Sequence, residues 1–85
     1  MSSAPVAVSA LSRATEAAAR LVAVELIVAA QAVDLAGCRG GLGLGLTRYH
    51  DAVRASCTPL SADRPLGAEI ERIAEGVRAG VFAPA

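Results

Sequence analysis

The longest stretch without a helix breaker limits most strongly what this chain can fold into. Residues 9–36 contain neither Gly nor Pro and are dense in Ala, Leu, Glu and Arg, all of them strong helix formers. At 1.5 Å per residue, a helix of this length spans roughly 40 Å. A compact chain of 85 residues has a diameter of only about 30 Å. We therefore expect one helix that is longer than any globule this chain can build.

Gly, Pro and cap signals divide the chain into segments. We expect a flexible leader over 1–8 and a single helical domain over 9–82, with helices over about 9–36, 47–56 and 66–79, a glycine-rich linker over 37–46 and a proline-containing loop over 57–65. Gly37 is the expected C-cap of the long helix, and Thr47 is the expected N-cap of the second. The sequence shows no alternating strand pattern. The expected fold class is all-α: one long helix plus two shorter ones, a bundle fragment that completes a larger helical assembly.

The surface of the long helix is mostly apolar. At 100° per residue its polar side chains lie within about 60° of one another and form one stripe (Arg13, Glu16, Arg20, Gln31 and Asp34). Val24 and Ile27 lie in the middle of that stripe, and apolar residues cover the rest of the cylinder. Two short helices cannot cover such a surface. We therefore expect self-association or insertion into another chain's bundle, with Val24 and Ile27 as candidate interface or structural residues.

Glu25 is the charged residue of the long helix that lies outside the polar stripe. It projects about 120° away from the polar stripe, into the apolar face. Burying an unpaired charge costs several kcal/mol, so this carboxylate needs a partner. It could serve as an acid or base in a partner's site. We favour the alternative, in which it is a structural residue that pairs with an Arg or a helix end across an interface.

Residues 40–45, GGLGLG, invite comparison with a phosphate-binding loop. Such a loop requires a strand before it and a helix N-terminus at the anion. Here a long helix precedes the glycines and no Lys follows them. A flexible linker between helices is the favoured interpretation.

Tyr49, His50 and Asp51 form a second polar cluster, with Cys57 nearby in sequence. A Cys–His nucleophile would need a third group to orient it, and neighbours on a helix point about 100° apart. We expect surface residues, with Tyr49 or His50 packing partway into an interface. Cys38 and Cys57 lack metal-ligand spacing and are expected to be free thiols, with a disulfide as the alternative. We expect no catalytic, cofactor-binding or metal-binding residue in this chain.

The third helix has the pattern of an amphipathic helix that docks on one side. Its apolar stripe has the spacing i, i+4, i+7, i+11 (Leu66, Ile70, Ile73 and Val77). Its other side carries charges three residues apart (Glu69, Arg72, Glu75 and Arg78). Asp63 and Arg64 precede this helix and are further candidate structural residues, with Arg64 free to pair with a carboxylate or to cap a neighbouring helix end.

The charge balance argues against two classes of partner. Eight Arg and no Lys balance eight Asp and Glu, and the single His leaves the net charge near zero. Nucleic acids and anionic membranes both attract clustered basic surfaces, so we expect neither. The most apolar stretch, residues 17–33, is interrupted by Arg20, Glu25 and Gln31 and falls short of a membrane span. The N-terminus lacks the basic start of a signal peptide, and a cytoplasmic location is expected.

Two strings carry a resemblance to a known family. Residues 22–35 read VAVELIVAAQAVDL, residues 58–70 read TPLSADRPLGAEI, and a V-R-x-G segment follows at 77–80. In this order they resemble two segments near the C-terminus of the histidine and aromatic amino-acid ammonia-lyases, with the patterns L-A-I-E-L-L-A-A-A-Q-A-L-D and P-P-L-x-x-D-R-P-L-x-P-D-I. The resemblance covers about residues 11–82. Its glycine-rich connector departs from the linker usual in that family.

The resemblance also indicates which functional residues of the family this chain lacks. The lyases and aminomutases of this family use an electrophilic methylidene-imidazolone (MIO) group, built from an internal Ala-Ser-Gly, and assemble as helical tetramers with shared sites. The chain contains no Ala-Ser-Gly, and it lacks the family's catalytic tyrosine loop and Asn-rich motifs. No catalytic residue therefore carries over. Glu25, Asp63 and Arg64 match family positions that we take to be structural.

The first functional hypothesis is a small, non-catalytic subunit of a split MIO-type ammonia-lyase or aminomutase. A larger chain would hold the MIO group, and this chain would complete its helical core in a hetero-oligomer. The alternative is a stand-alone helical interaction or oligomerisation module without enzyme activity. A truncated reading frame without function is a third hypothesis, which the unmatched leader Met1–Ala7 makes less attractive.

Overall fold

The computed structural model describes residues 4–84, and all the regular structure within them is helical. The elements are α1 (Ala4–Ala36), the short 3-10 helix η1 (Arg39–Gly41), α2 (Gly43–Ser56) and α3 (Gly67–Arg78). The expected all-α class, with one long helix and two shorter ones, is confirmed. No helix in this part of the chain combines the length and apolar character needed to cross a membrane.

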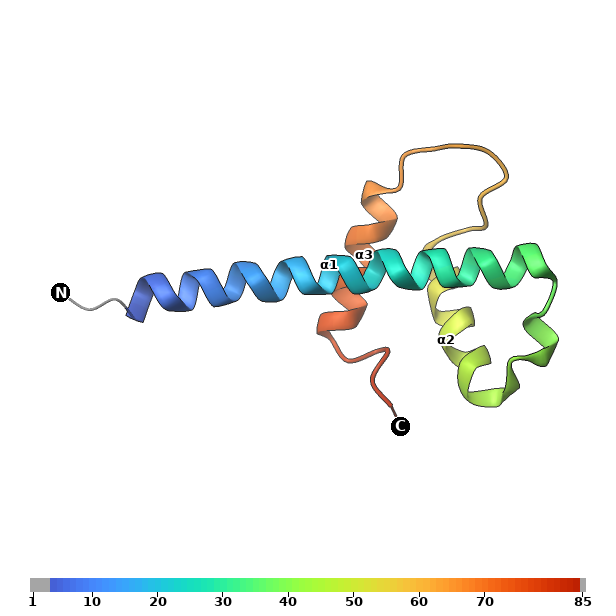
Figure 1. The fold of residues 1–85 in the computed structure, drawn as a ribbon, viewed down its shortest axis with the longest axis horizontal. Coiled ribbons are helices and arrows are strands. Elements are labelled where there is room, and N and C mark those ends of the chain that lie inside the picture. Colours follow the sequence, from blue (N-terminus) through green and yellow to red (C-terminus); the bar gives the residue numbers. More distant parts are fainter. Residues whose placement is uncertain (1–3, 85) are drawn as a thin grey trace.

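The long helix determines the shape of the molecule. With 33 residues, α1 is roughly 50 Å long. The described chain measures 57 × 32 × 16 Å and has a radius of gyration of 15.6 Å, whereas a compact chain of this size would have about 12 Å. In Figure 1 the N-terminal part of α1 projects well beyond the other helices. The expectation of a helix longer than its globule is confirmed.

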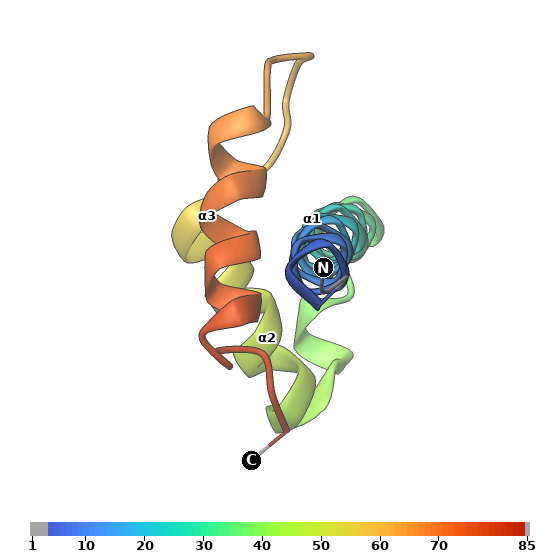
Figure 2. The ribbon, with the colours of Figure 1, turned by 90° about the vertical axis from the view of Figure 1, so that its left-hand side faces the viewer.

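Both shorter helices pack on one side of α1. Viewed along α1 from its N-terminal end, α2 and α3 lie together on one side, and no other described element covers the opposite side (Figure 2). α3 crosses α1 near its middle, and α2 lies under its C-terminal part (Figure 1). The described residues therefore form a one-sided arrangement rather than a closed bundle.

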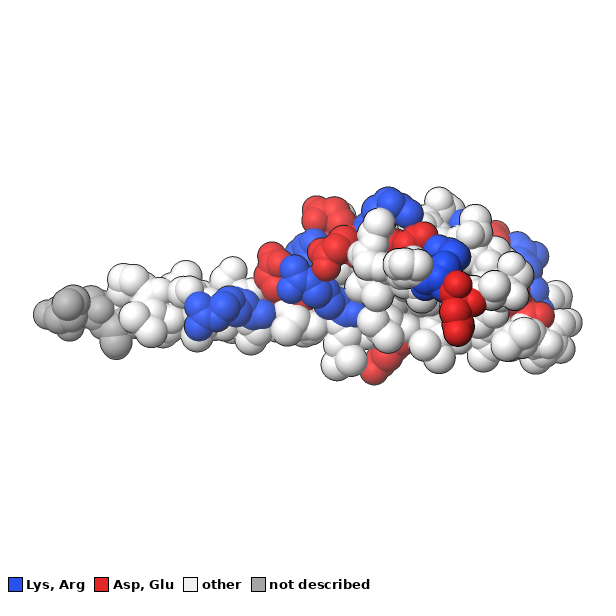
Figure 3. Space-filling model, turned by 90° about the horizontal axis from the view of Figure 1, so that it is seen from above, with Lys and Arg blue, Asp and Glu red and all other residues white. Residues whose placement is uncertain are grey.

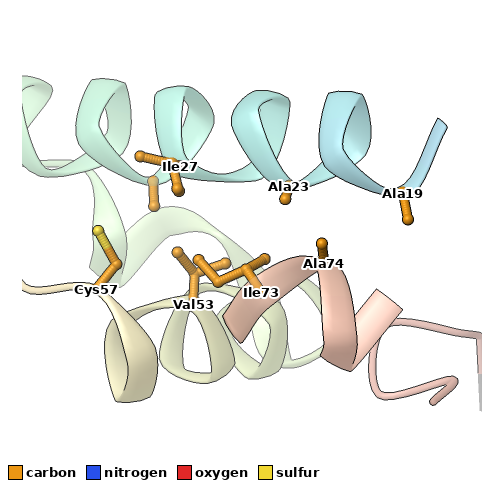
Figure 4. Close-up of a cluster of buried hydrophobic side chains, with 8 residues drawn as sticks. Ala19, Ala23, Ile27, Val53, Cys57, Ile73 and Ala74 are labelled. Atoms are coloured by element: carbon orange, nitrogen blue, oxygen red, sulfur yellow. The ribbon is translucent and has the colours of Figure 1, made fainter. Parts of the chain in front are cut away.

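The core is small and lies where the three helices meet. In Figure 4, side chains of α1 point toward α2, α3 and the start of the loop that joins them. The buried apolar residues are Ala19, Ala23, Ile27, Ala30, Val53, Cys57, Ile73 and Ala74, and Leu26, Leu66, Ile70, Val77 and Phe82 pack around them. Alanines dominate the α1 side, so the helices can approach closely but bury little side-chain volume. The apolar stripe of α3 expected from its spacing faces this core.

α1 begins at Ala4, so the expected flexible leader over 1–8 is wrong for residues 4–8, while its first three residues lie outside the described part. Pro5 is tolerated because it lies in the first turn, where its missing N–H would have no intrahelical acceptor. The residues that follow contain no further breaker before Gly37. Residues 4–8 therefore belong to the helix instead of preceding it.

α2 also begins earlier than expected, at Gly43 rather than Thr47. The glycine-rich linker over 37–46 contains η1 and the first turn of α2. Gly43 has a φ of +78°, which glycine adopts without steric cost, and this allows the chain to turn from η1 into α2. Thr47 is not the N-cap, because its hydroxyl donates a 2.6 Å hydrogen bond to the Gly43 carbonyl within the helix.

The ends of α1 and α3 are fixed by glycines. Gly37, with a φ of +65°, donates its N–H to the Asp34 carbonyl at 3.1 Å, and Cys38 donates to Val33 at 3.2 Å. This is the Schellman pattern, so the expected C-cap is confirmed. A φ of +81° at Gly80 and a bond from Val81 to the Gly76 carbonyl end α3 in the same way.

Candidate functional site

The polar end of α1 meets α2 in a network of hydrogen bonds. Asp34 of α1 accepts two contacts from α2: its Oδ1 lies 2.8 Å from Nε2 of His50, and its Oδ2 lies 2.8 Å from Nε and 2.6 Å from Nη2 of Arg54. Arg54 also donates to the Cys57 carbonyl at 3.0 Å and lies 3.4 Å from Oε1 of Gln31. The Asp34 carboxylate thus joins α1 to α2.

The same network fixes the loop after α2. The side-chain amide of Gln31 donates to the Leu60 carbonyl at 3.1 Å, and its oxygen accepts the Leu60 N–H at 3.0 Å. A single side chain therefore satisfies both backbone groups of a loop residue. This holds the loop over 57–66 against α1.

Asp34 stays ionised because the combined effect of its partners on its pKa is larger than the opposite effect of its burial. Burial by itself raises the pKa of this carboxyl, but the hydrogen bonds from Arg54 and His50 and their charges hold the pKa below its ordinary value of 3.8. A hydrogen bond from Arg39 similarly lowers the pKa of Asp51. The network is therefore anionic at Asp34 and ordered at neutral pH.

His50 was expected at the surface or partway into an interface, and within this chain it is buried, with 8% of its area exposed. Its Nδ1 atom is buried without a hydrogen-bond partner among the described residues, and the nearest carboxylate oxygen on its own helix, Oδ1 of Asp51, is 3.7 Å away. His50 also has no hydrogen bond to a Ser, Thr or Cys side chain in this part of the chain. The His50–Asp34 pair is thus not part of a nucleophile–base arrangement.

An apolar groove of about 520 Å³ opens beside this network, between α1, α2 and the C-terminal segment. Its walls are aliphatic and aromatic, and they include Val22, Leu26, Val33, Leu42, Leu46 and Phe82. The Tyr49 ring stacks on Phe82 with centroids 6.3 Å apart, and its hydroxyl donates to the Ala83 carbonyl at 3.3 Å. The volume is that of a ligand pocket. However, both polar residues of its lining, Tyr49 and His50, bond within the chain, so the groove offers a partner mainly apolar surface.

A second ion pair fixes the entry to α3. Arg64 of the loop contacts Glu69 at 2.6 Å and donates to the Thr58 carbonyl at 2.9 Å. The pKa of Glu69 is lowered first by its own backbone N–H and then by Arg64, and the pKa of Arg64 is raised by Glu69. The expected pairing of Arg64 with a carboxylate is confirmed, whereas its neighbour Asp63 is exposed and makes no hydrogen bond or ion pair with the described residues.

The five residues singled out from the sequence do not form one site. Val24 is 40% exposed on α1, and Glu25 is exposed beside it. Ile27 was expected in the polar stripe but is 4% exposed and belongs to the core. α2 and α3 cover that side of α1, and Ile27 packs under them. Asp63 and Arg64 lie on the separate loop before α3.

The sequence interpretation missed the Asp34–His50–Arg54 network. Its members are 16 and 20 residues apart, and such a contact depends on how the glycine linker turns. A signal was present, since Gln31 and Asp34 lie on the edge of α1 next to the apolar positions that became buried. Cys57 is buried, Cys38 is exposed, and both are free thiols as expected.

These features define an open helical chain whose polar groups join its own elements. No group of three or more His, Cys, Asp or Glu side chains over residues 4–84 is arranged to hold a metal ion. Over the same residues, the polar contacts described above join helices and loops of one molecule.

Comparison with known proteins points to one enzyme. Over 63 residues the chain is 36% identical to an MIO-dependent tyrosine 2,3-aminomutase of Streptomyces globisporus. The match covers 74% of this chain but only 12% of the relative, so the chain spans about an eighth of that enzyme. No protein-family model and no solved structure matches. This partial similarity supports a relation to the MIO-dependent lyases and aminomutases, in agreement with the resemblance read from the sequence.

Proposed function

We propose that this chain is a small, non-catalytic subunit of an MIO-type ammonia-lyase or aminomutase, completing the helical core of a larger catalytic chain. The observation that carries the proposal is the match to the tyrosine 2,3-aminomutase, which covers most of this chain and a small part of the enzyme. The one-sided packing of α1 supports it, because a helix with an uncovered apolar face requires a partner.

The MIO group would belong to the larger chain. It forms from an Ala-Ser-Gly tripeptide, which this sequence does not contain, so the residues of this chain do not fit the group. The contribution of this chain is structural: α1 adds an apolar helix, and the Gln31 and Asp34 contacts hold α2 and the following loop against it. The chain would thereby fix the position of helices that wall the larger chain's site.

A co-expression experiment tests the proposal. This chain, tagged, is co-expressed with an MIO-type chain encoded beside it, and the purified material is measured for size, ultraviolet absorbance of the MIO group, and elimination and amino-shift activity. A stable complex whose activity depends on this chain is the expected result. A larger chain that is fully active alone and does not bind this chain would contradict the proposal.

The structure provides variants for that experiment. Leu21→Glu places a charge on the uncovered face of α1, where Leu21 is 61% exposed, and is expected to weaken the complex. Leu44→Glu, on α2 at a residue 94% exposed, is the matched control and should bind normally. If both variants bind equally well, the uncovered face of α1 is not part of the interface.

The alternative, a stand-alone helical oligomerisation module, is favoured by one observation, the regular apolar spacing on the same uncovered face. It predicts a cooperative homo-oligomer that neither binds an MIO-type chain nor changes its activity.

A further inference from the structure

The uncovered face of α1 has a seven-residue repeat. Apolar residues recur at spacings of three and four along nearly the whole helix (Ala7, Ala10, Ala14, Ala17, Leu21, Val24, Val28 and Leu35). We call these residues the α1 seam. All of them are exposed in the described chain. Gln31 would continue the spacing, but its amide is bonded to Leu60.

This spacing is that of the a and d positions of a coiled coil. The a positions are residues 7, 14, 21, 28 and 35, and the d positions are 10, 17 and 24, with Gln31 at the next d position. From residue 7 to residue 35 the seam extends over roughly 42 Å. A strict seven-residue repeat holds a second helix along its whole length when the two helices supercoil. The buried residues of α1 are Ala19, Ala23, Ile27 and Ala30 and lie mainly on another face. The two faces meet at Ile27 and Asp34, which occupy g positions and contact the rest of the chain.

The charges beside the seam indicate which helix fits. Glu25 occupies an e position and makes no hydrogen bond or ion pair with the described residues. Arg20 occupies a g position, five residues earlier, where its half-exposed side chain contacts Glu16 and Glu71 of its own chain. In a parallel pair, the g residue of one helix lies opposite the e residue five positions later on the other. Two parallel copies therefore bring Arg20 of each helix to Glu25 of the other.

An antiparallel pair offers Glu25 no such partner. There e positions face e positions, and the e positions of α1 are Leu11, Ala18, Glu25 and Ala32, none of them basic. The g position Asp34 is already bonded to His50 and Arg54. Charge complementarity thus selects one orientation.

We propose that two copies of this chain associate in parallel through the α1 seam, with Arg20 of each copy paired to Glu25 of the other. The inference goes beyond the proposed function, because it assigns the α1 seam to a second copy when no larger chain is bound. α2 and α3 lie together on one side of α1 (Figure 2), whereas the seam residues are exposed. The loop at Leu60 borders the seam near Val28, Gln31 and Leu35.

The projecting part of α1 favours close contact between the copies. Figure 3 shows few charged groups along this part, while charges gather over the region where α1 and α3 meet. Arg13 is the only charged residue from 4 to 15. The alanines at the N-terminal seam positions allow the helix axes to approach, and the Leu and Val side chains of the C-terminal positions provide the apolar area that stabilises the pair.

The first test measures the mass of the purified full chain by sedimentation over a dilution series. A dimer that dissociates on dilution is expected. Leu21→Glu should raise the dimer Kd by at least about tenfold, whereas Leu44→Glu, outside the seam, should leave it within about twofold. Circular dichroism confirms that both variants keep their helices. A chain that stays monomeric at all concentrations, or a Leu21→Glu variant that associates normally, would overturn the proposal.

The second test exchanges charges. Arg20→Glu and Glu25→Arg each create like charges across the seam and should each raise the Kd about threefold to tenfold. Mixing the two variants should restore association as a heterodimer, because each new charge then faces its opposite. Arg20 also contacts Glu71 at 2.8 Å, so Glu71→Gln, which frees Arg20 within its own chain, serves as the control and should not raise the Kd. Variants that do not restore each other would rule out the parallel register.

The third test reports orientation through Cys38, which is exposed just after the end of α1 while Cys57 is buried. A spin label on Cys38 should lie within about 30 Å of its counterpart in a parallel pair. An antiparallel pair would separate the labels by roughly 45 Å and would contradict the inference. If this chain associates only after an MIO-type chain is added, the seam binds that chain instead of a second copy, and the proposal is overturned.

Discussion

Nε2 of His50 lies 2.8 Å from Oδ1 of Asp34, and this contact joins the last turn of α1 to the middle of α2. The glycine-rich linker between the two helices has little side-chain packing of its own, so their relative position depends on Asp34 and its partners. Arg54 binds the other oxygen of the same carboxylate. The stability of the joint therefore depends on the charge of one residue.

Acidification is expected to destabilise the chain through this carboxylate. The pKa values of Asp34, Asp51 and Glu69 are lowered in the folded state from ordinary values of 3.8, 3.8 and 4.5. A group whose folded pKa is depressed contributes stability above its unfolded pKa and loses it as the pH falls through the folded pKa. The stability that these three carboxylates contribute should thus be fully present above about pH 5 and be lost progressively as the pH falls through their lowered pKa values in the folded state.

Thermal unfolding monitored by circular dichroism from pH 7 to pH 2.5, at fixed protein concentration, measures this loss. Asp34→Asn removes the titrating group and should unfold at a lower temperature at pH 7 but depend less on pH. An acid dependence equal to that of the natural chain would show that Asp34 does not contribute to the joint.

Ile73→Ala tests the small core. Ile73 is the largest of the fully buried side chains, at 1% exposure, and its truncation should cost about 2–5 kcal/mol of unfolding free energy, while Ile73→Val should cost about 0.5–1.5 kcal/mol. Urea unfolding gives both values. Leu44→Ala, at a residue 94% exposed, is the control and should change stability by less than about 0.5 kcal/mol. Equal effects at the two positions would place the core elsewhere.

Gly37→Ala tests the end of α1. A β-carbon at Gly37 meets no neighbouring atom, but its φ of +65° is strained for any other residue, so we expect a loss of about 1 kcal/mol. Gly40→Ala, also in open space but without a positive φ, isolates the backbone effect and should be neutral or slightly stabilising. The two chemical-denaturation curves should therefore differ in midpoint.

Gln31→Leu tests the attachment of the loop. The substitution leaves the Leu60 N–H and carbonyl without their partner, at a cost of about 1–3 kcal/mol. The Leu60 amide hydrogen should exchange with solvent much faster, while the amide hydrogens of α3 exchange as before. Unchanged exchange at Leu60 would mean that other contacts hold the loop.

Glu25→Leu separates two roles of the uncovered face. In the parallel pair proposed above, we expect the change to raise the dimer Kd modestly, because it removes the partner of Arg20 at the edge of the seam. In a complex with an MIO-type chain, reduced activity would mean that Glu25 orients groups near the site. Normal activity in a confirmed complex would leave Glu25 with a structural role only.

The parts of the fold that depend on local chemistry could be predicted from the sequence. Gly37 and Gly80 end helices because only glycine adopts a positive φ readily, and the apolar stripe of α3 faces the core because its spacing is regular. The start of α1 lies earlier than predicted, because Pro5 is in the first turn and does not prevent the helix from including residues 4–8. The sequence also predicted, without any knowledge of the packing, that the long helix is longer than the diameter of a compact chain of this size.

The site depends on contacts that no local pattern records. Whether His50 reaches Asp34 is decided by the turn through η1 and Gly43, and the glycines alone permit many such turns. Ile27 was placed with the polar stripe because its angular position is near it, but the side on which α2 and α3 dock made it a core residue. Arg64 could be predicted, since its carboxylate partner lies five residues away.

Because α1 projects beyond α2 and α3, hydrogen exchange along its projecting part can report how much of the helix a partner covers. The first buried residue of α1 is Ala19, so the turns before it are added to a helix whose nucleus is already fixed by the core. Such turns open one after another from the free end, and their amide hydrogens should exchange in that order. When a second helix covers them, the boundary between fast and slow exchange should move toward Ala4, and its position would measure how much of the seam is occupied.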